Sequence, residues 1–204
     1  MAVLVIDPLV EDDLLARRRA SGGDRYDEVW DGVYLMSPIP NSEHQQLAGR
    51  LTGVFLQVVG WNPRVEVFPG INVSDRVDDW RQNYRVPDVA VFLENTRARD
   101  LGTHWLGGPD FGVEIESPKD RSRDKIPFYA QVGVQELLLI EREPWALELY
   151  RLQGDALTLV GRVVPGDEAA LESTVLAVRF RLIPANPRPL IEVTRLDGSE
   201  RWLV

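Results

Sequence analysis

The sequence predicts an α/β domain in which a mixed β-sheet is flanked by helices and followed by a C-terminal β extension. Short apolar runs of strand character lie at residues 88–93, 111–116, 134–141 and 146–152. Two helical segments, 43–59 and 124–132, are interleaved with these runs. After Gly154 the recognisable elements are strand-like, which indicates a β extension rather than a further α/β unit.

The predicted domain has three parts: an N-terminal arm (1–25), a core (26–152) and a C-terminal β extension of the same domain (153–204). A chain of 204 residues is long enough to form one domain, which would bury roughly 70% of its unfolded surface. The arm opens with a short apolar run that no basic region precedes, so we expect a strand or an arm rather than a signal peptide. A short helix from near Glu11 to Gly22 completes the arm.

The core is expected to begin with a hairpin and a helix. Asp31-Gly32 is a strong hairpin signal, and the second strand of the pair is expected near residues 33–36. Asn41 or Ser42 can cap the helix predicted over 43–59. Apolar residues at spacings of three and four form one face of this helix: Leu47, Leu51, Val54, Phe55 and Val58.

The rest of the chain is predicted to alternate strands and loops around one further helix. Residues 65–74 read as a strand pair or a bent strand, and residues 95–109 as a long loop. The helix over 124–132 tolerates a proline in its first turn and stops at Gly133. Strand-like pieces of the extension lie at 156–164 and 178–183.

The composition narrows the possible functions. The chain has no cysteine, which excludes disulfides, thiolate zinc sites, iron–sulfur clusters and a cysteine nucleophile, and fits a reducing cytoplasm. No stretch approaches the ~20 apolar residues of a membrane span. A net charge of −9 and a pI of about 4.8 argue against a broad nucleic-acid-binding surface. Local basic clusters at 119–125 and at Arg81 and Arg85 leave room for a basic rim or for an ordinary solvated loop.

Three carboxylates stand in or beside buried strands, where an ionised side chain is costly without a partner. Asp88 opens the first run, and Glu114 and Glu116 lie in the second, on one face and about 7 Å apart. If the two strands are neighbours, Asp88 can meet Glu114 at one end of the sheet. Converging carboxylates share protons or bind a cation, and oxygen ligands favour Mg²⁺ or Mn²⁺.

The same residues also permit a purely structural interpretation. Ion pairs account for most carboxylates in strands, and Glu116 can be either a metal ligand or a salt-bridge partner of Arg121 or Arg123. Lys125 on the following helix is the candidate cation for stabilising charge in phosphodiester cleavage or orienting the attacking water. Its alternative is an exposed lysine covering the helix edge.

The order of motifs resembles the PD-(D/E)xK nuclease superfamily, and within it the restriction-endonuclease family formerly classed as a domain of unknown function. The resemblance covers roughly residues 26–152 and rests on four pieces: YDEVWDGVYLMSPIPNSEH, VPDVAVF, VEIESPKDRSRDK and FYAQVGVQELLLI. It implies a restriction-endonuclease-like fold, a four-stranded mixed core sheet flanked by helices. The active site would lie where two central strands diverge, and a divalent metal would be used.

The resemblance also implies roles for particular residues. Asp88 and Glu114 match the metal-binding acids, and Glu116 stands where the superfamily signature has lysine. Lys125 matches the lysine that this family carries on the following helix. Glu43 matches an acid that many members place near the metal, and its alternative is an acid favoured by the helix dipole. His44 matches the family pattern, as a proton shuttle or as a structural histidine.

Three functions follow from these patterns. The first is a Mg²⁺- or Mn²⁺-dependent endonuclease acting on DNA, with Asp88, Glu114 and Glu116 as metal ligands and Lys125 and Glu43 as further catalytic residues. The second is an inactive nuclease-like fold serving as an oligomeric binding module, which the acidic surface favours. The third is a nuclease acting on RNA or on structured repair substrates. The long loop at 95–109 and the tryptophans, Trp105 among them, suggest a homodimer.

Overall fold

The protein is described from a computed structural model, which covers residues 8–117 and 121–204. The apolar run that opens the predicted arm lies outside the described residues, and so does Lys119. The helices are α1 (Pro8–Ser21), α2 (Ser42–Val59) and α3 (Ile126–Gln131), and the 3₁₀ turns are η1 (Trp80–Gln82) and η2 (Ser122–Lys125). Among the described residues, no helix combines the length and the hydropathy that a membrane span requires.

The strands form three sheets. The central sheet has the order β12 (Ala156–Val163), β11 (Trp145–Gln153), β10 (Glu136–Arg142), β9 (Phe111–Ile115), β6 (Val89–Phe92), β3 (Glu66–Phe68). A sheet of short strands has the order β2 (Val33–Leu35), β1 (Glu28–Trp30), β5 (Tyr84–Arg85), β4 (Val73–Ser74), β8 (Trp105–Leu106), β7 (Arg99–Asp100). The C-terminal sheet has the order β13 (Leu171–Ser173), β14 (Val178–Ile183), β15 (Leu190–Arg195), β16 (Arg201–Leu203).

The four strands predicted for the core, β6, β9, β10 and β11, are adjacent in the central sheet. β9 and β10 are parallel, whereas the pairs β6–β9 and β10–β11 are antiparallel, so the sheet is mixed as predicted. The chain crosses from β9 to β10 through η2 and α3, because parallel neighbours need a crossover connection. The structure adds β12 and β3 at the two edges.

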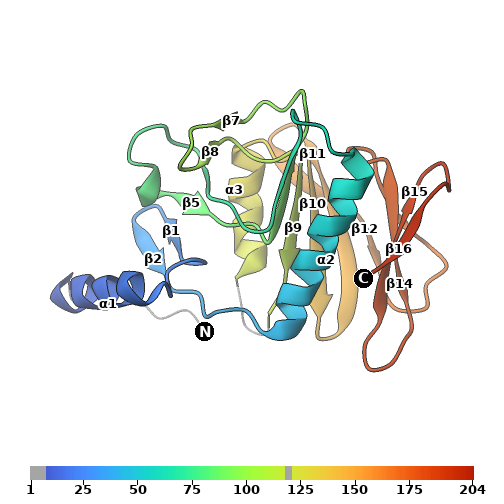
Figure 1. Cartoon of the computed structure of the whole chain (residues 1–204), viewed down its shortest axis with the longest axis horizontal. Coiled ribbons are helices and arrows are strands. Elements are labelled where there is room, and N and C mark those ends of the chain that lie inside the picture. The colour runs from blue at the N-terminus through green and yellow to red at the C-terminus, as the bar shows by residue number, and fades with distance from the viewer. Residues whose placement is uncertain (1–7, 118–120) are drawn as a thin grey trace.

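Each face of the central sheet is covered by different elements. α2 lies across one face beside the C-terminal sheet, and α1 projects on the far side of the molecule (Figure 1). Phe55 of α2, Phe111 of β9 and Phe180 of β14 meet with ring centroids 5.4 to 6.4 Å apart, so helix and both sheets share one cluster. α3 and the sheet of short strands contribute to a second cluster on the other face.

α2 confirms the predicted helix, including its ends. The Asn41 side chain accepts a hydrogen bond from the backbone N–H of His44 at 3.0 Å, which caps the first turn. Gly60, with a φ of 74°, ends the helix in a conformation that favours glycine. The cap fixes His44 at the start of α2, beside the end of the central sheet.

Two predictions for the core need correction. The loop predicted over 95–109 contains β7 and β8, and Trp105 of β8 is buried against Phe92, with the rings stacked 3.6 Å apart. The helix predicted from Asp124 begins at Ile126, because residues 122–125 form a 3₁₀ turn. Trp105 is therefore a core residue, and Trp61, which is 86% exposed, is the tryptophan that faces solvent.

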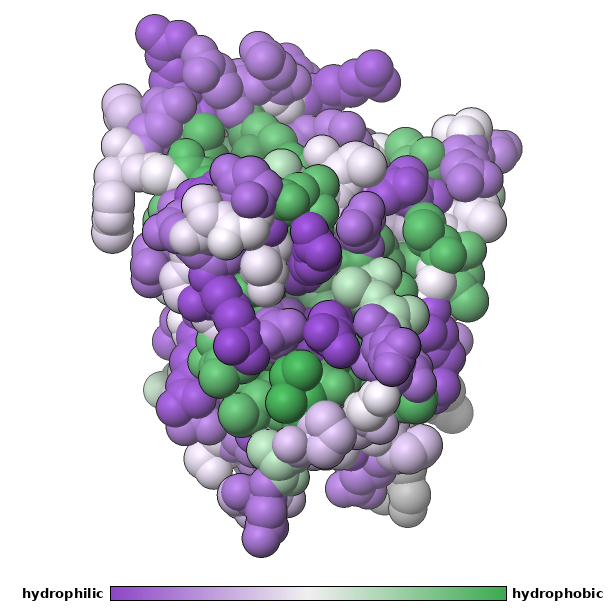
Figure 2. Space-filling model, turned by 90° about the vertical axis from the view of Figure 1, so that its right-hand side faces the viewer, coloured by the Kyte–Doolittle hydropathy of each residue, from purple (hydrophilic) through white to green (hydrophobic). Residues whose placement is uncertain are grey.

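The C-terminal sheet has more strands than the sequence predicted, since β13, β15 and β16 were missed. Figure 2 looks onto this side of the molecule and shows hydrophilic side chains separating several apolar patches. Val178, Phe180 and Leu182 alternate inward along β14 and are buried in the shared cluster. The outward residues of the same strand are half-buried, the pattern of a sheet with one covered face.

Glu136 ties the C-terminal sheet to the central sheet, and its removal is expected to be strongly destabilising. Its fully buried carboxylate accepts hydrogen bonds from Arg151 at 2.7 Å, Ser173 at 2.5 Å and Thr174 at 3.0 Å. We expect Glu136→Ala to lower the free energy of unfolding by about 3–5 kcal/mol, because it removes the buried acceptor that Arg151, Ser173 and Thr174 share. Urea denaturation measures this, and the exposed Glu172→Ala is the control, expected within about 0.5 kcal/mol of wild type.

Candidate active site

A cavity of about 310 Å³ opens at the end of the central sheet where β6 and β9 separate. The β6–β9 ladder ends at the pair Val89–Val113, whereas β9 continues beside β10 as far as Ile115. One side of the cavity is charged and is lined by Glu28, His44, Asp88, Glu114, Lys125 and Arg142. The other side is apolar and includes Trp30, Leu35, Met36, Pro38, Ile39 and Pro40.

The strand register places Asp88 opposite Glu114, just beyond the end of the β6–β9 ladder. Val89 and Val113 are paired and both enter the core under α2. Glu114 therefore points to the opposite face, where Tyr129 of α3 contacts it, whereas Asp88, which precedes β6, contacts His44 at the start of α2. Because directly opposed residues of an antiparallel pair have Cβ atoms about 4.5–5.5 Å apart, the two side chains start as neighbours.

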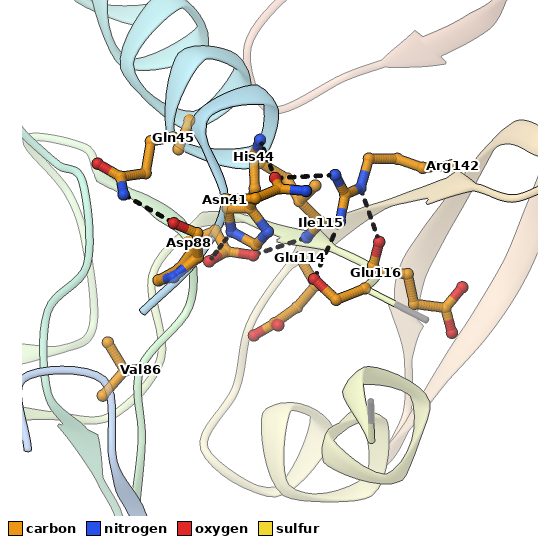
Figure 3. Close-up of polar contacts among 12 residues, drawn as sticks. Asn41, His44, Gln45, Val86, Asp88, Glu114, Ile115, Glu116 and Arg142 are labelled. Carbon is orange, nitrogen blue, oxygen red and sulfur yellow. Dashed lines mark hydrogen bonds and ion pairs between the residues drawn. The ribbon is translucent and has the colours of Figure 1, made fainter. Parts of the chain in front are cut away.

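Asp88 is held from two sides, as Figure 3 shows. Its Oδ2 accepts a hydrogen bond from the backbone N–H of Ile115 at 2.7 Å, and its Oδ1 lies 2.7 Å from Nε2 of His44. An ionised carboxylate only accepts, so Nε2 of His44 donates. The Nδ1 atom of the same ring is buried and has no hydrogen-bond partner among the described residues. The sequence left two roles open for His44, a structural one and that of a proton shuttle. In the structure His44 orients Asp88.

Glu114 is buried at 2% exposure and shares its carboxylate with two donors from the chain that follows. Lys125 Nζ lies 3.1 and 2.9 Å from the two carboxylate oxygens, and the Tyr129 hydroxyl donates to Oε1 at 2.5 Å. The short η2 turn positions Lys125 one turn of chain ahead of Tyr129. The geometry therefore brings together three residues that the sequence analysis singled out, namely Asp88, Glu114 and Lys125.

Glu28 completes the charged side of the cavity. This buried residue of β1 lies with Oε1 2.8 Å from Lys125 Nζ. The same oxygen accepts a hydrogen bond from the backbone N–H of Val86 at 2.8 Å, and Oε2 accepts one from the indole N–H of Trp30 at 2.7 Å. Lys125 consequently lies between two buried carboxylates, Glu28 and Glu114.

This arrangement shifts the protonation equilibria of the buried groups. Burial raises the pKa of Glu114 to about 8; Lys125 opposes the shift, and Asp88 and Glu28 add to it by repulsion. Burial favours neutral Lys125, yet the charges of Glu114, Glu28 and Asp88 together raise the pKa of Lys125 above its usual value. The neighbouring carboxylates therefore favour the charged form of Lys125, and burial favours the protonated form of Glu114.

Glu116 lies in a different ion-pair network from Glu114. Its carboxylate is 3.1 Å from Nε of Arg123, whose other nitrogens contact Glu141 and Glu148 on β10 and β11. Figure 3 shows the carboxylates of Glu114 and Glu116 pointing apart. The structure thus gives Glu116 the salt bridge with Arg123, one of its two predicted roles, and its carboxylate is directed away from the other two acids.

Glu43 is not among the residues that line the cavity. Its carboxylate pairs with Arg142 at 3.0 Å and with Arg188 at 3.7 Å, and its side chain is 38% exposed. Arg142 in turn donates to the backbone carbonyl of Glu116 at 3.0 Å and to Asn41 at 3.3 Å. Arg142 therefore joins the start of α2 to the end of β9, and Glu43 belongs to this structural clamp.

Three residues of the site were not predicted as functional. Glu28 lies in the short hairpin strand, Arg142 at the end of β10, and Tyr129 was assigned to the core. The sequence carried a weak signal for Glu28, since it is a carboxylate followed directly by Val29 and Trp30 in a predicted strand. Tyr129 is buried as predicted, but its hydroxyl donates to Glu114, which a hydropathy pattern cannot reveal.

The donor set at the open end of the site fits a hard divalent ion. Asp88 and Glu114 provide two carboxylates at the end of adjacent strands; burial is the main cause of the raised pKa of Glu114, and repulsion from Asp88 and Glu28 adds to it. Among residues 8–117 and 121–204, no group of three or more His, Asp or Glu side chains is gathered as a metal site. Two carboxylates suffice for Mg²⁺, which commonly keeps several waters and uses one or two protein carboxylates.

Comparisons with known proteins agree with this architecture. A solved structure described as "a putative nuclease belonging to DUF820" from Anabaena variabilis ATCC 29413 superposes with a TM-score of 0.58. The two chains are 20% identical, and the match covers 76% of this chain and 84% of the other. This likeness shows the restriction-endonuclease-like fold. No curated protein matches the chain.

The family comparison covers most of the molecule. The family described as "Putative restriction endonuclease" (Uma2) matches residues 12–183. This range includes every residue that lines the cavity, from the hairpin with Glu28 through the start of α2, β9 and η2 to Arg142 at the end of β10. The resemblance expected from the motifs is confirmed: the chain belongs to the Uma2 family of restriction-endonuclease-like proteins.

Proposed function

We propose that the protein is a metal-dependent endonuclease that hydrolyses phosphodiester bonds in DNA, with Mg²⁺ or Mn²⁺ as its cofactor. The single observation that carries this proposal is the meeting of Asp88, Glu114 and Lys125 in one cavity at the point where two central strands separate. Opposed carboxylates with an adjacent lysine can bind a cation and stabilise charge at a phosphate. A purely structural pair would not need an open cavity beside it.

Each residue has a distinct task in the proposed reaction. Asp88 and Glu114 would hold the ion, and His44 and the backbone of Ile115 keep Asp88 in place. The bound ion would supply Lewis-acid activation of water and neutralise charge on the phosphate. Lys125 stays cationic and would orient the nucleophilic water or stabilise the developing negative charge. We also predicted Glu116 and Glu43 as site residues. In this proposal they would act through their ion pairs with Arg123 and Arg142 rather than beside Asp88, Glu114 and Lys125.

The substrate and the assembly are further parts of the proposal. The family description supports a nucleic-acid substrate, and DNA is the substrate we propose. Arg121, half exposed at the cavity wall and 4.7 Å from the Trp30 ring, offers a cation for the phosphate backbone despite the acidic net charge. A homodimer, which would let two sites cut opposite strands, remains a prediction from the sequence, and light scattering tests it.

Plasmid nicking tests the proposed function directly. We expect wild-type protein to nick supercoiled DNA in Mg²⁺ or Mn²⁺ and not in EDTA, and Asp88→Asn to lose at least roughly 10²-fold of this rate. Asp110→Asn is a matched control, because Asp110 is buried at the other end of the same two strands, where it accepts from the backbone N–H of Leu93 at 2.8 Å. Equal loss in both variants, or no metal-dependent nicking by wild type, would refute the proposal and favour the inactive binding module.

A further inference from the structure

We propose that Glu28 is a positioning residue that holds the Lys125 ammonium at the active site when Glu114 binds the metal ion. This inference rests on the proposed function and extends it to a residue outside the central sheet. Lys125 has two carboxylate partners, Glu28 and Glu114. Glu114 is also needed for the ion, so a cation bound there competes with Lys125 for the same oxygens. Glu28 is the carboxylate that would remain paired with Lys125 when the metal ion occupies the oxygens of Glu114.

The geometry of Glu28 suits it to hold a lysine rather than to bind metal. Its Oε1 already accepts from the backbone N–H of Val86 at 2.8 Å, and its Oε2 from the indole N–H of Trp30 at 2.7 Å. These two neutral donors fix the carboxylate independently of Lys125. They also use lone pairs that a metal ion would need. The remaining strong contact is the one to Lys125 Nζ at 2.8 Å.

The hairpin that carries Glu28 is itself anchored from the other side. Asp27, the preceding residue, points to the opposite face of β1, where its buried carboxylate accepts from Arg18 Nε at 2.6 Å and from Tyr34 at 2.7 Å. Asp27 thus fixes the hairpin, and Glu28 fixes the lysine. Because Asp27 and Glu28 are adjacent but have different contacts, a variant of Asp27 can serve as the control for a variant of Glu28.

The sequence makes Lys125 unusually easy to observe. Lys119 and Lys125 are the only lysines in the chain, which otherwise uses arginine for its positive charges. A compact ammonium fits between two carboxylates, whereas the planar guanidinium of arginine needs a side-on partner. Protein labelled with ¹³C at the lysine Cε gives two signals, and Lys119→Arg assigns the remaining one to Lys125.

The first experiment measures the order of the Lys125 side chain by NMR without metal and without turnover. In Glu114→Gln, which removes one of the two partners, we expect the Lys125 Cε order parameter to stay near its wild-type value. In the double variant with Glu28→Gln it should fall to that of a mobile side chain. A fall in Glu114→Gln alone, to the level of the double variant, would overturn the inference even if Glu28→Gln proved unstable.

The second experiment separates positioning from metal binding. We expect Glu28→Gln to lower kcat about 10–100-fold, the usual range for residues that orient an active-site group, while the calorimetric affinity for Mg²⁺ changes less than twofold. Combining it with Lys125→Met should cause no further loss, because the two residues act as one unit. Asp27→Asn is the control: it should lower the melting temperature but spare the hydrogen bonds from Val86 and Trp30 to Glu28, so the Lys125 signal and kcat should be unchanged.

The outcomes distinguish this inference from the proposed function. If Glu28→Gln lost its affinity for Mg²⁺, Glu28 would be a metal ligand. If the losses of kcat in Glu28→Gln and Lys125→Met were fully additive, Glu28 would have a structural role only. Either result would reject the positioning role. Absence of cleavage by wild-type protein would instead refute the nuclease proposal. The NMR measurement then still decides whether Glu28 holds Lys125, because it requires no catalysis.

Discussion

Glu114→Gln is expected to abolish metal binding and to reduce metal-dependent DNA cleavage by at least roughly 10²–10³-fold. Glutamine keeps the size of the side chain and its hydrogen bond from Tyr129, but it removes the negative charge that would hold the ion. Isothermal titration of Mg²⁺ or Mn²⁺ should give heat with wild-type protein and none with the variant. This measurement tests the site without any choice of substrate.

A second buried glutamate provides the matched control. Glu192 on β15 is 8% exposed and pairs with Arg201 in the C-terminal sheet, far in the fold from the cavity. Glu192→Gln is expected to bind Mg²⁺ and cleave DNA like wild type. If Glu114→Gln retains wild-type metal affinity, Glu114 is not a ligand and the proposed site is wrong.

The raised pKa of Glu114 adds a pH dependence to the same variant. Burial keeps Glu114 protonated in the folded protein up to about pH 8, whereas the unfolded chain releases this proton near pH 4.5. This group's contribution to stability is therefore fully present below pH 4.5 and is lost as the pH rises toward 8. In metal-free urea titrations, the free energy of unfolding should therefore fall less between pH 4.5 and 8 in Glu114→Gln than in wild type, by an amount on the order of a few kcal/mol.

Lys125→Met is expected to have the largest combined effect on activity and stability. Without the ammonium, the proposed nuclease loses the group that stabilises charge at the phosphate, and cleavage should drop roughly 10²–10³-fold. The folded protein also keeps two buried carboxylates, Glu28 and Glu114, without their shared cation. Leaving buried charges unpaired costs about 3–5 kcal/mol.

The destabilisation by Lys125→Met should depend on pH. At pH 6 Glu114 takes up a proton and relieves part of the repulsion, so the loss of unfolding free energy should be smaller there than at pH 8. Urea denaturation in EDTA at both pH values measures the difference. Adding Glu114→Gln should recover part of the stability at pH 8 but none of the activity. Equal destabilisation at both pH values would show that Lys125 acts through packing alone.

Local sequence patterns were enough to predict the core of the fold. The period of the apolar residues identified α2 and the four central strands, and Asp31-Gly32 identified the hairpin, whose two turn residues both have positive φ. The short strands β5, β7 and β8, of two residues each, escaped prediction, whereas β4 lies within the strand pair predicted over residues 65–74. Two residues carry no measurable period, so such strands exist only because neighbouring chain segments pair with them.

The site shows the same division. From the alternation of side chains in two strands we predicted that Asp88 and Glu114 meet at one end of the sheet, and Lys125 on the following helix was the candidate cation, a position that the family resemblance also implies. Alternation also put Glu116 on the face of Glu114, but the strand ends at Ile115, and the residue after it contacts Arg123 instead. Side chains alternate between the two faces only while the strand remains regular. The sequence does not show at which residue β6 and β9 separate.

The sequence by itself indicated that Glu114 is a carboxylate in a buried central strand and that it needs a shared proton or a cation, but it did not single out Glu136 and Glu148, which are buried in the neighbouring strands. Only the tertiary structure decided which cations and which further acids gather there. Glu28, His44 and Lys125 come from three elements whose meeting depends on the packing of the hairpin, α2 and η2 against one end of the sheet. The alternation of side chains is a property of one strand and can be read from its residues. An ion pair joins residues that are far apart in the chain, so no local sequence pattern predicts which residues will meet.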